Sequence, residues 1–215
     1  MPVRKIKKNY RNVTGISSAT KAVGQAQFES TLERDFLRLL EFSPEVDRFE
    51  VQPRTIRWRD DSDAECSYTP DVLVTFTEAA ARPPWLCEVK YRSGLRKDWA
   101  ELHPKFIQAI RYAKHQGWRF RLITECEIRG PDLDAAKFLL PFRRHPIPPE
   151  RKTRLLDVLN ILGKSTPQAL LQALSSDPQE QAEWLPALWQ LVANFDIGMD
   201  FEEPITMTSK LWSLP

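Results

Sequence analysis

The sequence is poor in the residue types that build several common functional sites. Only three cysteines, Cys66, Cys87 and Cys126, occur among its 215 residues, and no two of them form a CxxC pair. Their odd number and wide spacing indicate neither a disulfide framework nor a zinc site, which fits a reducing cytoplasm. The three histidines also lack the spacing of metal ligands or of a catalytic triad. Any chemistry is therefore expected from other residue types.

Glycine-rich motifs and long apolar runs are missing as well. The seven glycines form neither a GxxxxGK[ST] nor a GxGxxG pattern, which argues against a P-loop ATPase or a dinucleotide enzyme. No apolar run approaches the roughly 18 residues of a membrane span, and the N-terminus lacks the apolar core of a signal peptide. We expect a soluble cytoplasmic protein without a membrane partner.

Charge of either sign is nearly balanced over the whole chain. The 31 Lys and Arg residues against 29 Asp and Glu give a net charge of +2, which is weak support for a polyanionic partner. The first eleven residues are an exception because they contain five basic residues and no acid: Arg4, Lys5, Lys7, Lys8 and Arg11. Such an arm could bind DNA phosphates, and a solvated terminus explains it equally well.

The N-terminal two thirds show the alternation of an α/β fold. Periodicity predicts a helix over residues 28–42 and another over 97–115. Residues 46–58 suggest two short strands around a bend at Gln52-Pro53, residues 68–76 and 85–91 a hairpin, and residues 120–124 a further strand. This order of helices and strands predicts an α/β core.

Beyond a proline-rich stretch at residues 141–149 the pattern changes. Residues 151–162, 167–174 and 183–194 are predicted to form short helices, followed by extended segments at 197–201 and 205–212. Helices closed by a two-stranded hairpin suggest a small winged-helix-like module. We therefore expect a basic arm at 1–20, a catalytic domain at 21–142 and an interaction domain at 143–215.

Two carboxylates and a lysine are expected to meet on the predicted hairpin. Asp71 follows Pro70 in the first strand, and Glu88 and Lys90 lie two residues apart in the second, so they share one face of the sheet. Convergent carboxylates repel unless a cation lies between them, and their hard oxygens suit Mg²⁺ or Mn²⁺. A lysine beside them could stabilise charge on a phosphate or an attacking water. This combination fits phosphodiester hydrolysis.

The same residues also have plainer interpretations. Glu88-Val89-Lys90 alone resembles the exposed face of an edge strand, although the apolar residues around the two charges favour partial burial. Glu33 lies in the apolar half of the first predicted helix, where a carboxylate requires a reason. Glu29 lies on the same half, and either could be a surface glutamate. Geometry alone leaves the choice between them open.

Four stretches of the chain resemble TnsA, the endonuclease subunit of heteromeric cut-and-paste transposases. They are residues 28–36 with their Ser-x-x-Glu pattern, Val51-Gln52-Pro53, Tyr68-Thr69-Pro70-Asp71 and Glu88-Val89-Lys90, in the family's order and spacing over about residues 20–130. The resemblance implies the catalytic set Glu33, Asp71, Glu88 and Lys90 and favours Glu33 over Glu29. It implies that Glu33, Asp71 and Glu88 are the metal ligands. Some members have Gln at the position of Glu88, so the role of this residue stays open.

The resemblance also implies a fold, a cofactor and partners. The expected fold is a restriction-endonuclease-like PD-(D/E)XK core, a mixed sheet flanked by helices, with a small C-terminal winged-helix-like domain. The expected cofactor is Mg²⁺, for which Mn²⁺ can substitute. The expected partners are double-stranded DNA at transposon ends, a DDE-type TnsB-like transposase that cuts the 3′ strands, and an AAA+ TnsC-like regulator. A stand-alone restriction or repair nuclease and a non-catalytic DNA-binding scaffold subunit are the alternatives.

Overall fold

The computed structural model describes residues 14–214, so the basic arm at Arg4, Lys5, Lys7, Lys8 and Arg11 lies outside the described residues. The chain divides into two compact units, Met1–Gly130 and Pro131–Pro215. The sequence analysis places the boundary after residue 142. In the structure α5 (Pro131–Leu139) and the short 3-10 helix η2 (Leu140–Phe142) contact helix α8 (Pro178–Ala193) of the second unit, partly through the rings of Phe138 and Trp189.

A four-stranded mixed sheet forms the centre of the first unit. Its order is β3-β6-β7-β8, built from β3 (Val46–Val51), β6 (Val72–Phe76), β7 (Trp85–Val89) and β8 (Arg119–Ile123). β6 is antiparallel to both of its neighbours, β3 and β7, whereas β7 and β8 are parallel. The predicted hairpin is confirmed, because Val72 pairs with Cys87 in the β6–β7 register.

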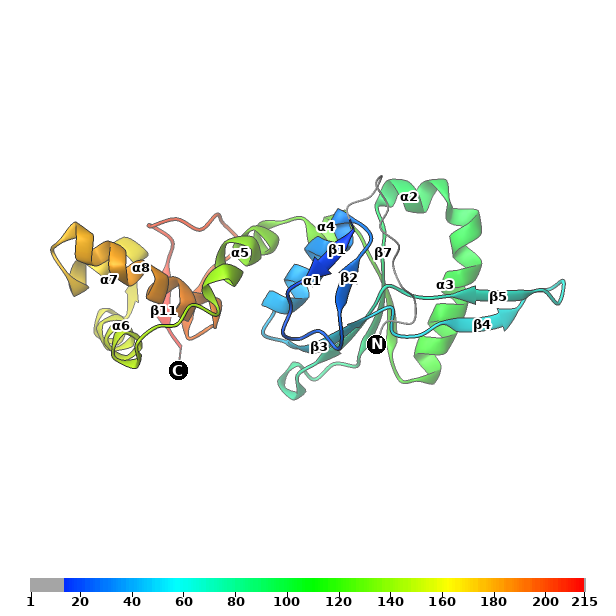
Figure 1. The fold of residues 1–215 in the computed structure, drawn as a ribbon, viewed down its shortest axis with the longest axis horizontal. Coiled ribbons are helices and arrows are strands. Elements are labelled where there is room, and N and C mark those ends of the chain that lie inside the picture. Colours follow the sequence, from blue (N-terminus) through cyan, green and yellow to red (C-terminus); the bar gives the residue numbers. More distant parts are fainter. Residues whose placement is uncertain (1–13, 215) are drawn as a thin grey trace. The chain divides into compact units, whose positions relative to one another are not determined.

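Helices cover this sheet on two sides, as Figure 1 shows for α1 (Thr31–Phe42) and α3 (Trp99–His115). α1 buries Leu32, Phe36, Leu37 and Leu40 and contacts β3 and β7. α3 packs Ala109 and Ala113 against Leu86 of β7. The first unit is therefore an α/β fold with a mixed sheet flanked by helices, as predicted.

Two two-stranded ribbons extend the first unit. β1 (Gly15–Ser17) pairs with β2 (Ala26–Phe28), so the predicted helix 28–42 begins later than expected, after its N-cap Ser30. β4 (Ile56–Arg59) pairs with β5 (Glu65–Tyr68). The single strand predicted over residues 68–76 is wrong, because the chain is interrupted at 69–71 between β5 and β6. Pro70 lacks a backbone N–H for a strand ladder, which accounts for the break.

Short elements that the periodicity did not indicate surround the sheet. The predicted helix 97–115 is confirmed as α3, and the short α2 (Arg92–Lys97), which was not predicted, precedes it with Asp98 between them. α4 (Glu125–Ile128) follows β8 and begins with a capping box between Thr124 and Glu127. The 3-10 helix η1 (Glu78–Ala80) lies in the β6–β7 connection. Segments this short contain too few residues to show the apolar repeat by which a helix is predicted from sequence.

The second unit has its own apolar core. Its elements are α5, η2, α6 (Pro149–Leu162), β9 (Lys164–Ser165), α7 (Pro167–Leu174), α8 (Pro178–Ala193), β10 (Ile197–Met199) and β11 (Leu211–Ser213). The strands form a sheet in the order β10-β11-β9. Residues 205–210, predicted as extended, form a turn and loop before β11. Across the described part of the chain, no helix is both long and apolar enough to cross a membrane.

Candidate active site

Asp71 lies at the break between β5 and β6, where three backbone contacts fix it. Its N–H donates to the Cys87 carbonyl at 3.1 Å, and its own carbonyl accepts from the Gln52 N–H at 2.7 Å. Its carboxylate Oδ2 accepts from the Val89 N–H at 2.7 Å. The sequence analysis expected Asp71 inside a strand, and this is wrong: the residue is held between the ends of β3 and β7. Its carboxylate therefore lies at the end of β7.

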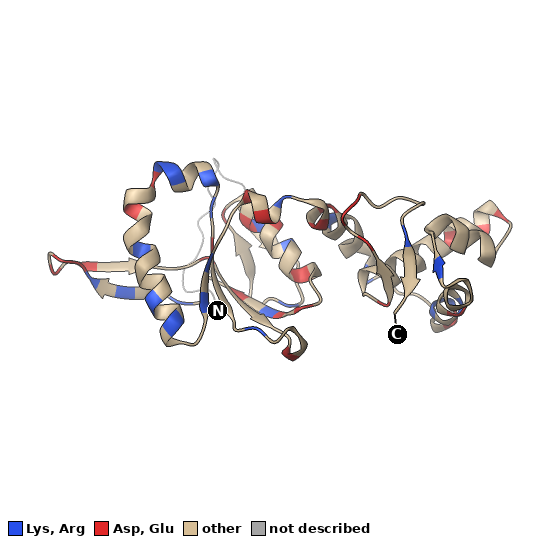
Figure 2. Ribbon diagram, turned by 180° about the vertical axis from the view of Figure 1, so that it is seen from behind, with Lys and Arg blue, Asp and Glu red and all other residues tan. Residues whose placement is uncertain are grey.

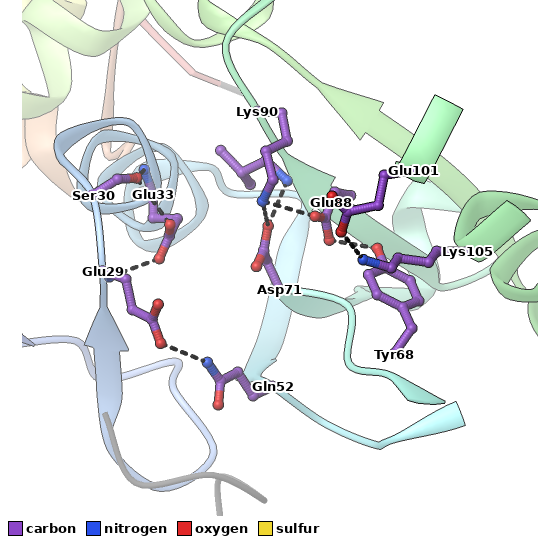
Figure 3. A network of polar contacts seen from close by, with 11 residues as sticks. Glu29, Ser30, Glu33, Gln52, Tyr68, Asp71, Glu88, Lys90, Glu101 and Lys105 are labelled. Atoms are coloured by element: carbon purple, nitrogen blue, oxygen red, sulfur yellow. Dashed lines mark hydrogen bonds and ion pairs between the residues drawn. The ribbon is translucent and has the colours of Figure 1, made fainter. Parts of the chain in front are cut away.

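Lys90 lies directly after β7, and its N–H donates to the Ile123 carbonyl of β8 at 3.0 Å. Its Nζ is 2.8 Å from Glu88 Oε1 and 3.8 Å from Asp71 Oδ2. The alternation of β7 and the adjoining residue puts Glu88 and Lys90 on one side, as predicted. Figure 3 shows the three side chains converging.

Glu88 is buried, with 3% of its side chain exposed. Its second oxygen, Oε2, accepts a hydrogen bond from the Tyr68 hydroxyl at 2.5 Å. A buried carboxylate is costly unless it is paired and hydrogen-bonded. Tyr68 and Lys90 together meet that requirement, one at each oxygen.

Burial and the neighbouring charges shift the pKa values of this cluster. Burial raises the pKa of Asp71 well above its ordinary value, and the charges of Glu88 and Glu33 raise it further, against the opposing effect of Lys90. Burial lowers the pKa of Lys90, but the charges of Asp71 and Glu88 outweigh it and the pKa is raised overall. Burial and then the charge of Glu88 raise the pKa of Tyr68. Lys90 and Tyr68 therefore keep their protons at neutral pH.

Glu33 reaches the cluster from the first turn of α1. Its Oε1 accepts from the Ser30 hydroxyl at 2.9 Å, and its Oε2 accepts from the Glu29 N–H at 2.8 Å. Ser30 Oγ in turn accepts from the Glu33 N–H at 3.1 Å, so the pair caps the helix. Burial raises the pKa of Glu33, while the charge of Lys90 lowers it. Glu33 therefore caps α1 and acts electrostatically on the Asp71–Lys90 group.

Glu29, which the sequence could not separate from Glu33, faces a different partner. The Gln52 Nε2 donates to Glu29 Oε1 at 3.4 Å. In Figure 3 the Glu29 carboxylate faces the amide nitrogen of Gln52, while the Asp71 carboxylate points toward Lys90. The structure therefore brings both glutamates to the same region.

The oxygen donors fit a hydrated divalent cation better than a metal enclosed by protein ligands. No group of three or more His, Cys, Asp or Glu side chains within residues 14–214 is arranged to hold a metal ion. Magnesium is usually held by one or two carboxylates and keeps several waters. Asp71 and Glu88 are such a pair. The raised pKa of Asp71 shows that the protein alone stabilises its negative charge poorly, and a bound cation would stabilise it. This donor set is compatible with Mg²⁺ or Mn²⁺.

The sequence analysis predicted no functional role for two side chains that the structure places at the site. Tyr68 comes from β5 and Gln52 from the end of β3, and both were seen only as parts of short motifs. The bend at Gln52-Pro53 was the available signal for one of them. No periodicity could have shown that Tyr68 bonds to Glu88, because the contact joins two separate strands.

A comparison with protein families bears on this region of the chain. Residues 43–125 match the family model described as TnsA-like endonuclease N terminal. The matched stretch contains Tyr68, Asp71, Glu88 and Lys90, whereas Glu33 precedes it. A comparison with curated proteins found no match. The match thus spans all four strands of the central sheet and includes three of the four expected site residues.

Proposed function

We propose that this protein is the endonuclease subunit of a transposase, because residues 43–125 match the family model described as TnsA-like endonuclease N terminal. In this proposal it cuts the 5′ strands at transposon ends during cut-and-paste transposition. A DDE-type TnsB-like subunit cuts the 3′ strands, and an AAA+ TnsC-like regulator controls the complex. The observation that carries the proposal is the convergence of Asp71, Glu88 and Lys90 inside the matched domain.

The fold supports a nuclease of the PD-(D/E)XK class. In that assignment Asp71 is the acidic residue at the start of the hairpin, and Glu88 and Lys90 are the two residues at its end. The mixed sheet flanked by α1 and α3 is consistent with a restriction-endonuclease-like core.

Asp71 and Glu88 would hold one or two Mg²⁺ ions, for which Mn²⁺ could substitute. Glu33 is proposed as a third ligand, which requires its carboxylate to leave its hydrogen bonds to Ser30 and the Glu29 N–H when the metal binds. The bound cation would polarise the scissile phosphate and stabilise the leaving 3′ oxygen. Lys90 keeps its proton, so its part is to orient the attacking water and to stabilise charge that develops on the phosphate. Tyr68 donates to Glu88 and holds that carboxylate in place.

The second unit supports a role in partner binding. The order α6, β9, α7, α8, β10, β11 and the sheet order β10-β11-β9 support a winged-helix-like domain. α8 contains Glu180 and Glu183 and no lysine or arginine, which suits a protein partner better than a phosphate backbone. We therefore assign this unit to the contact with the regulator.

Strand-resolved cleavage of transposon-end DNA tests the proposal. The assay contains Mg²⁺ and the presumed transposase and regulator, and compares the natural chain with Asp71→Ala and Lys90→Ala. Both substitutions should abolish the 5′-strand cuts and leave the 3′-strand cuts, while both variants remain folded by circular dichroism. Unchanged 5′ cutting would exclude the catalytic assignment, and 5′ cutting without partners would favour a stand-alone nuclease.

A further inference from the structure

β8 is an outer strand of the central sheet, and one of its two edges pairs with no strand among residues 14–214. On the paired edge, the Arg119 N–H donates to the Pro84 carbonyl just before β7 at 2.9 Å. Alternate residues of a strand direct their backbone groups to opposite sides. The N–H and C=O groups of Phe120 and Leu122 therefore point away from β7, toward the free edge.

A groove of about 530 Å³ lies beside this edge, between β8 and α3. Two large side chains that α3 contributes to it are substantially exposed, Trp99 at 48% and Ile110 at 51%. The strand contributes the half-buried side chains of Phe120 and Leu122. The same two strand residues thus provide both apolar surface and free backbone groups.

An open strand edge beside an apolar groove suits an extended peptide. The peptide would pair its own N–H and C=O groups with those of Phe120 and Leu122, and every second side chain would enter the groove. Double-stranded DNA suits the edge less well, because phosphate oxygens only accept hydrogen bonds and would leave the outward carbonyls of β8 without donors.

The other face of β8 indicates the charge of the remaining peptide side chains. Arg119 and Arg121 are exposed on that face, and Arg121 lies over the ring of Trp85, 5.0 Å from its centroid. Within residues 14–214 neither guanidinium forms an ion pair or a hydrogen bond. Opposite charges across a strand pair stabilise it, and like charges destabilise it. Acidic residues are therefore the matching neighbours.

The same charges argue against two occupants supplied by this chain. A second copy that paired with β8 through its own β8 would bring Arg119 and Arg121 next to the same arginines of the copy. The first eleven residues of the chain contain five basic residues and no acid, so their charge is also of the wrong sign.

We propose that the groove between α3 and the free edge of β8 binds an extended segment of a partner protein, in which apolar residues alternate with acidic ones. The bound segment forms a further strand of the central sheet. It lies next to β8, whose Leu122 is opposite Glu88 of the candidate site in the β7–β8 register. The docking surface is independent of the proposed cleavage, and its test needs neither DNA nor metal.

Selection of a random-peptide phage library on the full chain tests the proposal, followed by titration of the enriched peptides by fluorescence anisotropy. The enriched peptides should alternate apolar and acidic residues. Ile110→Asp places a charge in the groove and should weaken their binding at least about tenfold. The matched control is Ile161→Asp, which changes an isoleucine of α6 that is 84% exposed and should leave binding unchanged.

Arg119→Glu tests the charge of the segment separately from the groove. This variant should bind the acidic peptides more weakly, and a selection on it should enrich peptides with basic residues at the alternate positions. Arg154→Glu reverses an exposed charge on α6 and should change neither result.

Amide hydrogen exchange distinguishes strand addition from other modes of binding. The amides of Phe120 and Leu122 should exchange more slowly when an enriched peptide is bound. Unchanged exchange at both amides, natural affinity in Ile110→Asp, or selection that enriches no alternating peptide would each overturn the proposal. Binding of duplex DNA that Ile110→Asp weakens to the same degree would assign the groove to nucleic acid and overturn it as well.

Discussion

At the scale of single residues, the ionised carboxylate of Asp71 lowers the free energy of unfolding at neutral pH. Its side chain is mostly buried, with 18% exposed, and lies near the charges of Glu88 and Glu33, so its pKa is raised. A raised pKa means that the folded chain binds a proton more tightly than the unfolded chain. The contribution of Asp71 to stability is therefore fully present below the unfolded pKa of about 3.9 and is lost as the pH rises through the folded pKa.

Asp71→Asn should consequently stabilise the protein at neutral pH while abolishing cleavage. The amide removes the charge, and its oxygen can still accept from the Val89 N–H. We expect a higher thermal midpoint than the natural chain at pH 7.5, with an advantage that shrinks as the pH falls toward about 4. Asp63→Asn, which removes an exposed carboxylate, should show little effect. A natural chain more stable than Asp71→Asn at pH 7.5 would refute this account.

Tyr68→Phe tests the other buried contact of the cluster. The substitution removes the hydroxyl that donates to Glu88 Oε2 and leaves a buried carboxylate oxygen unsatisfied. The free energy of unfolding, measured by urea denaturation, should fall by about 1–3 kcal/mol. Tyr112→Phe on α3 removes a hydroxyl with no hydrogen bond among residues 14–214 and serves as the control. Equal effects of the two changes would show that the Tyr68 bond contributes nothing.

At the scale of elements, α2 stands out by its charge. It carries Arg92, Arg96 and Lys97 without an acidic residue, and Figure 2 shows this helix blue without red. It begins two residues after Lys90, and none of its residues is buried. The guanidinium of Arg92 contacts Cys126 Sγ at 3.5 Å, which leaves Arg96 and Lys97 as the better candidates for phosphate contacts.

If the proposed function holds, the double change Arg96→Gln and Lys97→Gln should weaken DNA binding and its dependence on salt. Each lost phosphate contact lowers the slope of log K against log salt by about 0.9. Fluorescence anisotropy at several salt concentrations measures this slope. The matched control, Arg111→Gln with Lys114→Gln, changes the same charge toward the C-terminal end of α3. Identical slopes for the two double variants would exclude α2 as a DNA contact.

At the scale of the whole molecule, the chain consists of two units with separate cores. The first is built around the sheet with Leu86 and Val74, and the second around Leu159, Leu188 and Leu211. In the second unit Gly198 of β10 lies against the indole of Trp212 on β11, and a Cβ at this position would overlap the ring. A side chain there requires the tryptophan to move.

Gly198→Ala should therefore destabilise the second unit by on the order of 1–3 kcal/mol. Because the candidate site lies entirely in the first unit, Mn²⁺ binding should be retained. Differential scanning calorimetry and Mn²⁺ titration of the full chain measure the two effects. Gly130→Ala, where a Cβ meets nothing within 4 Å, is the control. Parallel loss of stability and Mn²⁺ affinity would contradict independent units.

The sequence by itself determined the main elements and part of the site. Periodicity located α1, the β6–β7 hairpin and α7, and two-residue alternation put Glu88 and Lys90 on one side. These features depend on neighbouring residues, whose geometry is set by the repeat of a helix or strand. Breaks and short elements were harder to predict: Asp71 was expected inside a strand, and α2 was not expected at all.

Only the tertiary structure decided how distant segments meet. It brings the Tyr68 hydroxyl of β5 to Glu88, the Gln52 N–H from the end of β3 to Asp71, and Glu33 of α1 into the field of Lys90. These contacts join residues that are remote along the chain, and no local repeat encodes them. Burial of Asp71, which raises its pKa, likewise arises from the packing of several elements at once. The chain's residue types therefore indicate the chemistry, while the fold sets the charges and hydrogen bonds that would carry it out.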